Sequence, residues 1–189
     1  CSFYLTNAID SRVKELIISL NPDICISMNW ISILNESIID LFPYGILNAH
    51  FGDLPSYRGN AVINWAVLNN EKQIAITIHQ MQPGEIDSGS IWKKLYLTLG
   101  QNTAVSEIVG FCRKNTPQLF LEVVNAIGKN EITSTAQSNL KLKPFRCYPR
   151  LPEYSKIDWT RSAAEIYSLI RASAKPYSGA YSYIKINDE

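Results

Sequence analysis

The sequence predicts an α/β fold built around a mostly parallel sheet. Segments with the apolar pattern of strands alternate along the chain with segments of helical periodicity, and this alternation favours a sheet covered by helices. The chain has 189 residues, of which 46% are hydrophobic. That size and composition allow one domain with a sizeable core and a small appendage.

The elements of the N-terminal part follow from apolar spacing and from helix start and stop signals. Ser11 is the expected N-cap of the first helix, and Asn21-Pro22 stops it. The second strand ends at Asn48-Ala49-His50. The expected order is a helix over residues 8–20, a buried strand over 24–28, a helix over 36–42 and a second buried strand over 45–49.

The middle of the chain continues the same alternation. Asn60 is the expected N-cap of a helix after the loop 51–60. In the next strand isoleucines alternate with other residues, which predicts that His79 points outward. Thr116-Pro117 is expected to kink or break the last helix. The expected elements are a helix over residues 60–68, strands over 74–81 and 91–97, and a long helix over 103–127.

The composition changes after about residue 128. Residues 139–152 carry four basic side chains, no acidic one and three prolines, which is typical of a linker. A helix over residues 161–173 and a strand over 181–186 follow. We therefore expect a core domain over residues 1–128, a linker over 129–160 and the beginning of a small second subdomain over 161–189.

Charge and cysteine content narrow the functional class. The formal net charge is +1, whereas general nucleic-acid and membrane-surface binders carry a basic excess. The chain has no apolar run long enough to span a bilayer and no signal-peptide pattern at its start. Its four cysteines form no CxxC pair, so neither a zinc site nor a disulfide framework is indicated. We expect a soluble, cytoplasmic protein.

Three polar residues could carry chemistry at one edge of the sheet. Asn48 and His50 end a strand two residues apart, on the same side, and Asp87 lies in a turn-rich loop after another strand. A carboxylate that orients an imidazole, with an amide that donates to a developing oxyanion, suits acyl transfer. The alternative is that Asp87 and Asn48 shape turns and that His50 is structural.

Three ordered motifs resemble the formyltransferase family that uses 10-formyltetrahydrofolate. The motifs are Asn48-Ala49-His50, then Leu54-Pro55-Ser56-Tyr57-Arg58-Gly59, then Asp87-Ser88-Gly89, with Asp87 37 positions after His50. The resemblance covers residues 8–189 and implies a Rossmann-like formyltransferase fold. It also implies that the N-terminal strands of that fold are missing here, and that only the start of its C-terminal subdomain is present. Gly52-Asp53 departs from the Ser-Leu that the family commonly has there.

The resemblance implies roles for individual residues. His50 would assist proton transfer, Asn48 would bond the oxyanion and Asp87 would hold His50, with no metal required. The co-substrate 10-formyltetrahydrofolate would lie against two loops. Their implied contact residues are Met28, Asn29, Trp30, Ile31, Ile33, Leu34, Gly84, Glu85 and Ile86.

The acceptor implied by the resemblance is the primary amine of a nucleotide-linked amino sugar, a precursor of cell-surface polysaccharide. The segments 64–71 and 77–81 are more similar to the sugar enzymes than to the tRNA enzymes. Tyr57, Arg58 and Arg150 are candidate contacts to the sugar or its diphosphate, although Arg58 could instead fix the shape of its loop. Methionyl-tRNA formylation, formyltetrahydrofolate hydrolysis and a non-catalytic binding module are the alternatives. A homodimer is a family tendency.

Overall fold

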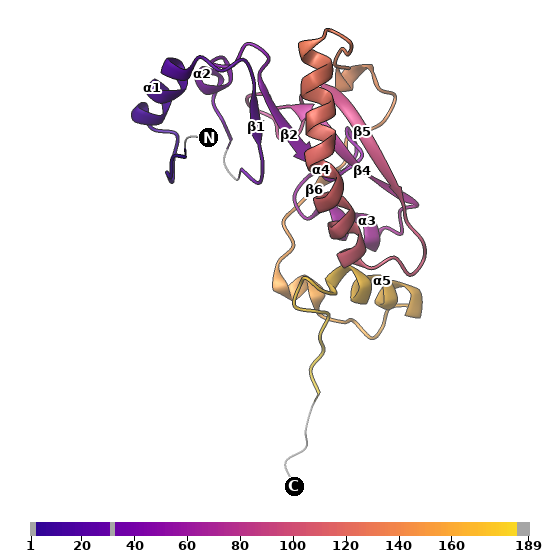
Figure 1. Ribbon diagram of the computed structural model, residues 1–189. Coiled ribbons are helices and arrows are strands. Elements are labelled where there is room, and N and C mark those ends of the chain that lie inside the picture. The colour runs from indigo at the N-terminus through magenta and orange to yellow at the C-terminus, as the bar shows by residue number, and fades with distance from the viewer. Residues whose placement is uncertain (1–2, 31–32, 185–189) are drawn as a thin grey trace.

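The computed structural model describes residues 3–30 and 33–184 (Figure 1). Helices and strands alternate, which confirms the α/β class. In chain order the elements are α1 (Ser11–Leu20), β1 (Cys25–Ser27), α2 (Glu36–Ile39), β2 (Ile46–His50), β3 (Arg58–Gly59), α3 (Val62–Leu68), β4 (Gln73–Gln80), β5 (Ile91–Thr98), α4 (Val105–Gly128), the 3-10 turn η1 (Gln137–Asn139), β6 (Arg146–Cys147), the 3-10 turn η2 (Pro152–Ser155) and α5 (Ala163–Ser173).

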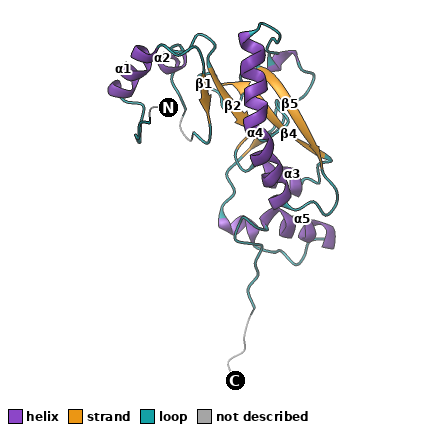
Figure 2. Ribbon diagram, viewed as in Figure 1, coloured by secondary structure: helices purple, strands orange, loops and turns teal. Residues whose placement is uncertain are grey.

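Four strands form the main sheet in the order β1-β2-β4-β5 (Figure 2). β1 and β2 are parallel, as expected, whereas the β2–β4 and β4–β5 pairs are antiparallel. The described part of the sheet is therefore mixed rather than mostly parallel. For the β4–β5 pair the physical reason is the length of the connection, because the loop 81–90 is too short for a crossover and only turns the chain back.

The core lies between the sheet and α4, which runs across it (Figure 1). β4 is buried from Ile74 to His79 and lies between β2 and β5. Its isoleucines pack in the core, whereas Thr77, on the opposite face, donates to the Gly52 carbonyl in the loop after β2. α4 is one continuous helix through Pro117, so the expected break is absent. Its buried residues are Val105, Ile108, Cys112, Thr116, Leu119, Phe120, Val123 and Ile127.

Several local expectations were wrong. Asp10, not Ser11, caps α1, because its carboxylate accepts the Val13 amide at 3.0 Å. Ala61 rather than Asn60 precedes α3 and makes no side-chain cap. β1 is not a buried strand, because it lies at the edge of the described sheet and Ile26 is 47% exposed.

Residues 129–160, expected to be a linker, fold back over the core. Thr135 pairs with Ile91 at the start of β5, and β6 pairs in parallel with β3. α5 then packs on α3, where buried Asn64 donates to the carbonyl of Ala172 at 2.7 Å. Of the strand expected over residues 181–186, Tyr181 forms a bridge with Lys156, and residues 185–189 lie outside the described part.

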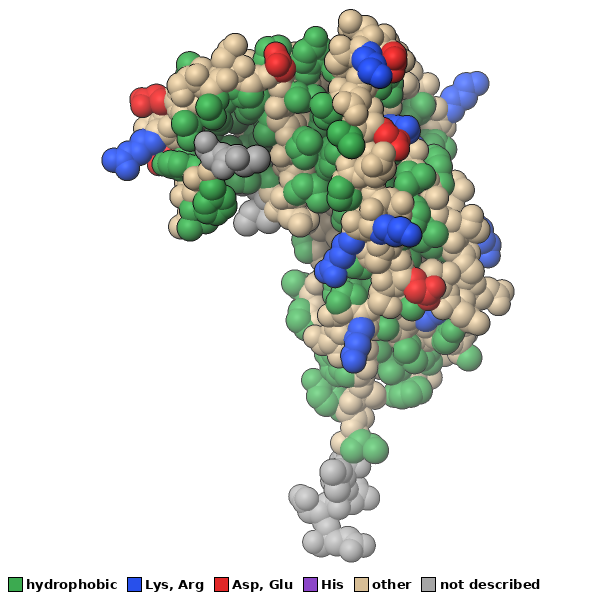
Figure 3. Space-filling view, in the orientation of Figure 1, with side chains coloured by type: hydrophobic (Ala, Val, Ile, Leu, Met, Phe, Trp, Pro, Cys, Tyr) green, Lys and Arg blue, Asp and Glu red, His purple; other side chains and the backbone are tan. Residues whose placement is uncertain are grey.

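The molecule is hollowed between the arm formed by α1 and α2 and the body that carries α4 (Figure 3). The arm has its own small apolar cluster, which includes Ile38 and Phe42. Within residues 3–30 and 33–184, no helix has the length and apolar character needed to cross a membrane.

The central position of β4 makes its isoleucines sensitive to truncation. Ile76 is fully buried in the main core, so Ile76→Ala should lower the free energy of unfolding by about 3 kcal/mol through lost burial and a residual cavity. The matched control is Ile18→Ala on the 57% exposed Ile18, which should cost below about 1 kcal/mol. Urea denaturation of both variants measures the difference, and equal losses would contradict the burial of β4.

Candidate active site

Two adjacent antiparallel strands supply three of the candidate side chains. In the β2–β4 pair Asn48 lies opposite His79, and His50 lies opposite Thr77. Side chains alternate across a strand, so Asn48 and His50 share one face of β2. His79 lies beside Asn48 on that face and is 2% exposed, so the expectation that it points outward was wrong.

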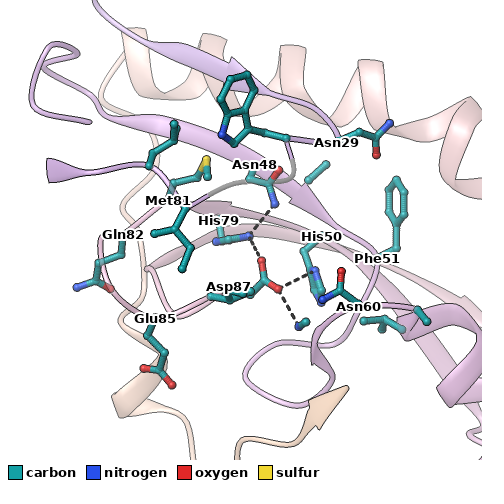
Figure 4. Close-up of a pocket in the computed structure, with 18 of the residues that line it drawn as sticks. Asn29, Asn48, His50, Phe51, Asn60, His79, Met81, Gln82, Glu85 and Asp87 are labelled. Carbon is teal, nitrogen blue, oxygen red and sulfur yellow. Dashed lines mark hydrogen bonds and ion pairs between the residues drawn. The ribbon is translucent and has the colours of Figure 1, made fainter. Parts of the chain in front are cut away.

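Asp87 lies between the two imidazole rings (Figure 4). Its Oδ2 is 3.4 Å from His50 Nδ1, and its Oδ1 is 3.4 Å from His79 Nε2. The amide of Gly59 donates to Oδ2 at 2.8 Å. The Nδ2 atom of Asn48 is 3.2 Å from His79 Nε2, which joins the amide to the same cluster. The carboxylate therefore lies beside both rings, and Asn48 joins the cluster through His79.

The outer nitrogen of each ring faces a main-chain carbonyl. His50 Nε2 is 2.6 Å from the Tyr57 oxygen, and His79 Nδ1 is 3.0 Å from the Gln80 oxygen. Carbonyl oxygens only accept, so a proton on the ring nitrogen that faces each carbonyl completes these two hydrogen bonds. Asn48 can then donate to His79 Nε2. A ring that gains a second proton donates it to Asp87.

Gly52 allows the close approach of His50 to this loop. A side chain at residue 52 would place its Cβ 2.7 Å from both His50 Nε2 and the carbonyl oxygen of Tyr57. Both contacts are too short for a carbon atom, so any larger residue must move the ring or the loop. The departure from the family pattern at Gly52 thus affects the orientation of His50.

Burial and charge set the protonation states. Burial lowers the pKa of His50 below its ordinary value, although the Asp87 carboxylate and the Tyr57 carbonyl oppose this shift. Burial acts to raise the pKa of Asp87, but His79, His50 and the Gly59 amide together hold it below its ordinary value. At neutral pH the site therefore contains an ionised carboxylate beside a neutral imidazole, which suits general-base chemistry.

The cluster forms part of the wall of a cavity of about 460 Å³. That volume is typical of a small-molecule site. Of the predicted folate contacts, six line it: Asn29, Trp30, Ile33, Leu34, Glu85 and Ile86. Met28 instead lines a separate apolar cavity between β1 and α4, Gly84 lines neither, and Ile31 lies outside the described residues.

The three predicted substrate contacts do not line this cavity. Tyr57 donates its hydroxyl to Glu71 at 2.5 Å, and its own carbonyl binds His50. Arg58 is 9% exposed and bonds to Glu85 and Gln137. The Arg150 guanidinium lies 5.8 Å from the centre of the Trp65 ring and donates to the Tyr154 carbonyl.

Sequence reasoning missed other residues of the site. His79 is the most important, and its signal was the position of β4 between two other strands, since a central strand is covered on both faces. The remaining cavity residues that were not predicted include Phe51, Asn60, Met81, Gln82 and Tyr177. In the described part of the chain, no group of three or more His, Cys, Asp or Glu side chains is arranged to hold a metal ion.

Comparison with known proteins identifies the family. The formyl transferase family matches residues 3–124, and the formyl transferase C-terminal domain matches residues 151–188. The chain belongs to the formyl transferase family. A bifunctional polymyxin resistance protein, ArnA, from Wigglesworthia glossinidia brevipalpis is 31% identical over 182 residues, covering 96% of this chain and 27% of ArnA. The chain thus spans about a quarter of the length of that relative.

Two solved structures confirm the formyltransferase fold. Methionyl-tRNA formyltransferase from Clostridium thermocellum has a TM-score of 0.70 and 22% identity, covering 90% of this chain and 70% of that one. The N-formyltransferase from Helicobacter canadensis, solved with folinic acid and dTDP-3-aminofucose, has a TM-score of 0.66 and 24% identity. That similarity covers 84% of this chain and 57% of the Helicobacter chain.

Removal of the Asp87 charge should change the pKa of His50. Asp87 raises the pKa of His50 against the effect of burial, so Asp87→Asn should lower that pKa further. The measurement is an NMR titration of the imidazole carbon-bound protons. Asp158→Asn is the matched control because Asp158 is exposed and bonds only near Thr160 and Arg161. An unchanged His50 pKa in Asp87→Asn would contradict the described geometry.

Proposed function

We propose that the protein transfers a formyl group from 10-formyltetrahydrofolate to the primary amine of a nucleotide-linked amino sugar. The observation that carries this proposal is the cluster of Asn48, His50 and Asp87 at the wall of one cavity. These three residue types supply an oxyanion donor, a base and a carboxylate that orients the base.

The reaction exchanges one carbon–nitrogen bond for another. The bond between the acceptor nitrogen and the formyl carbon forms, the bond between that carbon and N10 of the folate breaks, and one proton moves from the acceptor nitrogen to N10. His50, which lies beside Asp87 at the cavity wall, accepts this proton and returns it. Asp87 stabilises the imidazolium in between.

The oxygen of the formyl group gains negative charge as the amine adds. Asn48 has two amide hydrogens, and only one of them is directed at His79. The second is available to the charged oxygen, and such donors contribute most when they are fixed before the reaction. His79 fixes Asn48, because it accepts from the amide while its own Nδ1 is bound to the Gln80 carbonyl.

The residues at the other end of the cavity fit the folate. Trp30, Ile33 and Leu34 offer an aromatic and an apolar surface for a flat ring system. The loop of Glu85 and Ile86 lies at the same cavity. This placement supports the sequence prediction that two loops hold the pterin.

The acceptor class is supported by three observations. The segments 64–71 and 77–81 are similar to those of the sugar enzymes. The Helicobacter relative was solved with a nucleotide-linked amino sugar. The formal net charge of +1 lacks the basic excess that binding of tRNA phosphates favours.

His50→Ala should reduce the rate of formyl transfer at least about 10³-fold while the Kd for folate stays within several-fold, because the imidazole acts in the transition state. Single-turnover kinetics and folate titration measure the two quantities. A variant with near-normal turnover would refute the role of His50.

The acceptor is tested with a panel of nucleotide-linked amino sugars, methionyl-tRNA and a sample without acceptor. We expect a mass gain of one formyl group on a sugar, absent with His50→Ala, when the full-length protein is incubated with 10-formyltetrahydrofolate. Detection of formylated tRNA would identify methionyl-tRNA as the acceptor, with the same formyl-transfer chemistry. Folate breakdown without acceptor would identify a hydrolase.

A further inference from the structure

The side chain of Gln137 is buried beside the catalytic loop and fully engaged. It is 5% exposed, and its Nε2 donates to the carbonyls of Asp87 at 2.7 Å and of Gly89 at 2.8 Å. Its Oε1 accepts from Arg58 Nε at 3.1 Å and from Nη2 at 2.8 Å. Both hydrogens and both lone pairs of this amide are therefore used within the protein.

These bonds hold a main chain that is otherwise unfavourable. Asp87 has a φ of 54°, in the left-handed region where residues other than glycine are strained. Gln137 binds its carbonyl, and the Gly59 amide binds its carboxylate. Asp87 is thus fixed from two sides, at the main chain and at the side chain, with its oxygens directed at His50 and His79.

Arg58 belongs to the same support. Its guanidinium bonds to Gln137 through two nitrogens and to Glu85 at 2.7 Å through the third. Arg58 precedes Gly59 in β3, so one short strand carries both the amide that binds the carboxylate and the side chain that holds Gln137. All three guanidinium nitrogens have protein acceptors, and Arg58 does not line the cavity. This geometry favours the loop-shaping alternative over a contact to the acceptor.

We propose that Gln137 and Arg58 are positioning residues that hold Asp87 between His50 and His79, so that the transfer rate depends on two residues that touch neither the folate nor the acceptor. The rate dependence rests on the proposed function, whereas the support of the loop does not. Gln137 lies in the segment 129–160, outside the part that matches the formyl transferase family proper. That segment thereby becomes part of the catalytic apparatus rather than a spacer.

The kinetic test uses Gln137→Glu, which keeps the size of the side chain and an acceptor for Arg58 but removes both hydrogens. We expect kcat to fall about 10- to 100-fold, because a small displacement of a catalytic group has that effect. The KM values for folate and acceptor should stay within threefold. Gln73→Glu is the matched control, since Gln73 is exposed at the start of β4, and it should leave kcat unchanged.

The pH profile distinguishes positioning from a general loss of structure. The titratable groups that face His50 are Asp87 and His79, and the Asp87 charge raises the His50 pKa. If the carboxylate moves away in Gln137→Glu, the acidic limb of kcat/KM should move to lower pH. A smaller folded fraction would lower the whole profile without moving the limb, and that result would overturn the proposal.

A double-mutant cycle distinguishes two roles of Arg58, namely holding Gln137 and binding the acceptor. Arg58→Lys removes the planar fork that engages Gln137. If Arg58 acts through Gln137, the double variant should be no slower than Gln137→Glu alone. A rise of more than tenfold in the acceptor KM of Arg58→Lys at unchanged kcat would show that Arg58 binds the acceptor, and the proposal would fail.

Hydrogen–deuterium exchange tests the support without relying on turnover. In Gln137→Glu the peptide covering residues 82–90 should exchange faster, while peptides from α4 and the control Gln73→Glu remain unchanged. Unaltered protection of residues 82–90 would overturn the proposal even in an active enzyme. If the unmodified protein transfers no formyl group but the loop exchanges as expected, the proposed function fails and the support of the loop stands.

Discussion

A largely buried carboxylate between two imidazole rings is the interaction on which the rest of the site depends. Asp87 is 3.4 Å from each ring and takes a main-chain amide as a third partner. A charge in that environment is stable only if its neighbours compensate for the lost water. The Gly59 amide donates to the carboxylate, and one nitrogen of each ring lies beside it. Gln137 instead holds the main-chain carbonyl of Asp87.

The central strand of the sheet, β4, brings the polar side chains of the site together. β4 pairs with β2 in a register that sets Asn48 beside His79, and the hairpin to β5 carries Asp87 back over the same edge. Antiparallel pairing therefore serves the site directly. A strand covered on both faces can hold a histidine at 2% exposure, which an outward-facing position could not provide.

The segment after α4 contacts several elements that surround the site. It pairs with the start of β5 through Thr135, supplies Gln137 to the loop that carries Asp87 and pairs β6 with β3. Tyr177, after α5, also lines the cavity. Residues that look like a connection in the sequence thus complete the cavity and its loop, since long-range pairing satisfies main-chain groups that would otherwise be exposed.

The sequence by itself determined the α/β class and most element positions, and it predicted that Asn48, His50 and Asp87 lie at one edge of the sheet, where the structure has them together. Those inferences rest on periodicity and on ordered motifs, which are local properties. Only the tertiary structure decided that His79 faces Asp87, that Arg58 binds Gln137 rather than the cavity, and that the sheet is mixed. Each of these features depends on which segments become neighbours in the fold. Arg58 and Gln137 are 79 residues apart, and a single sequence contains no signal that pairs them.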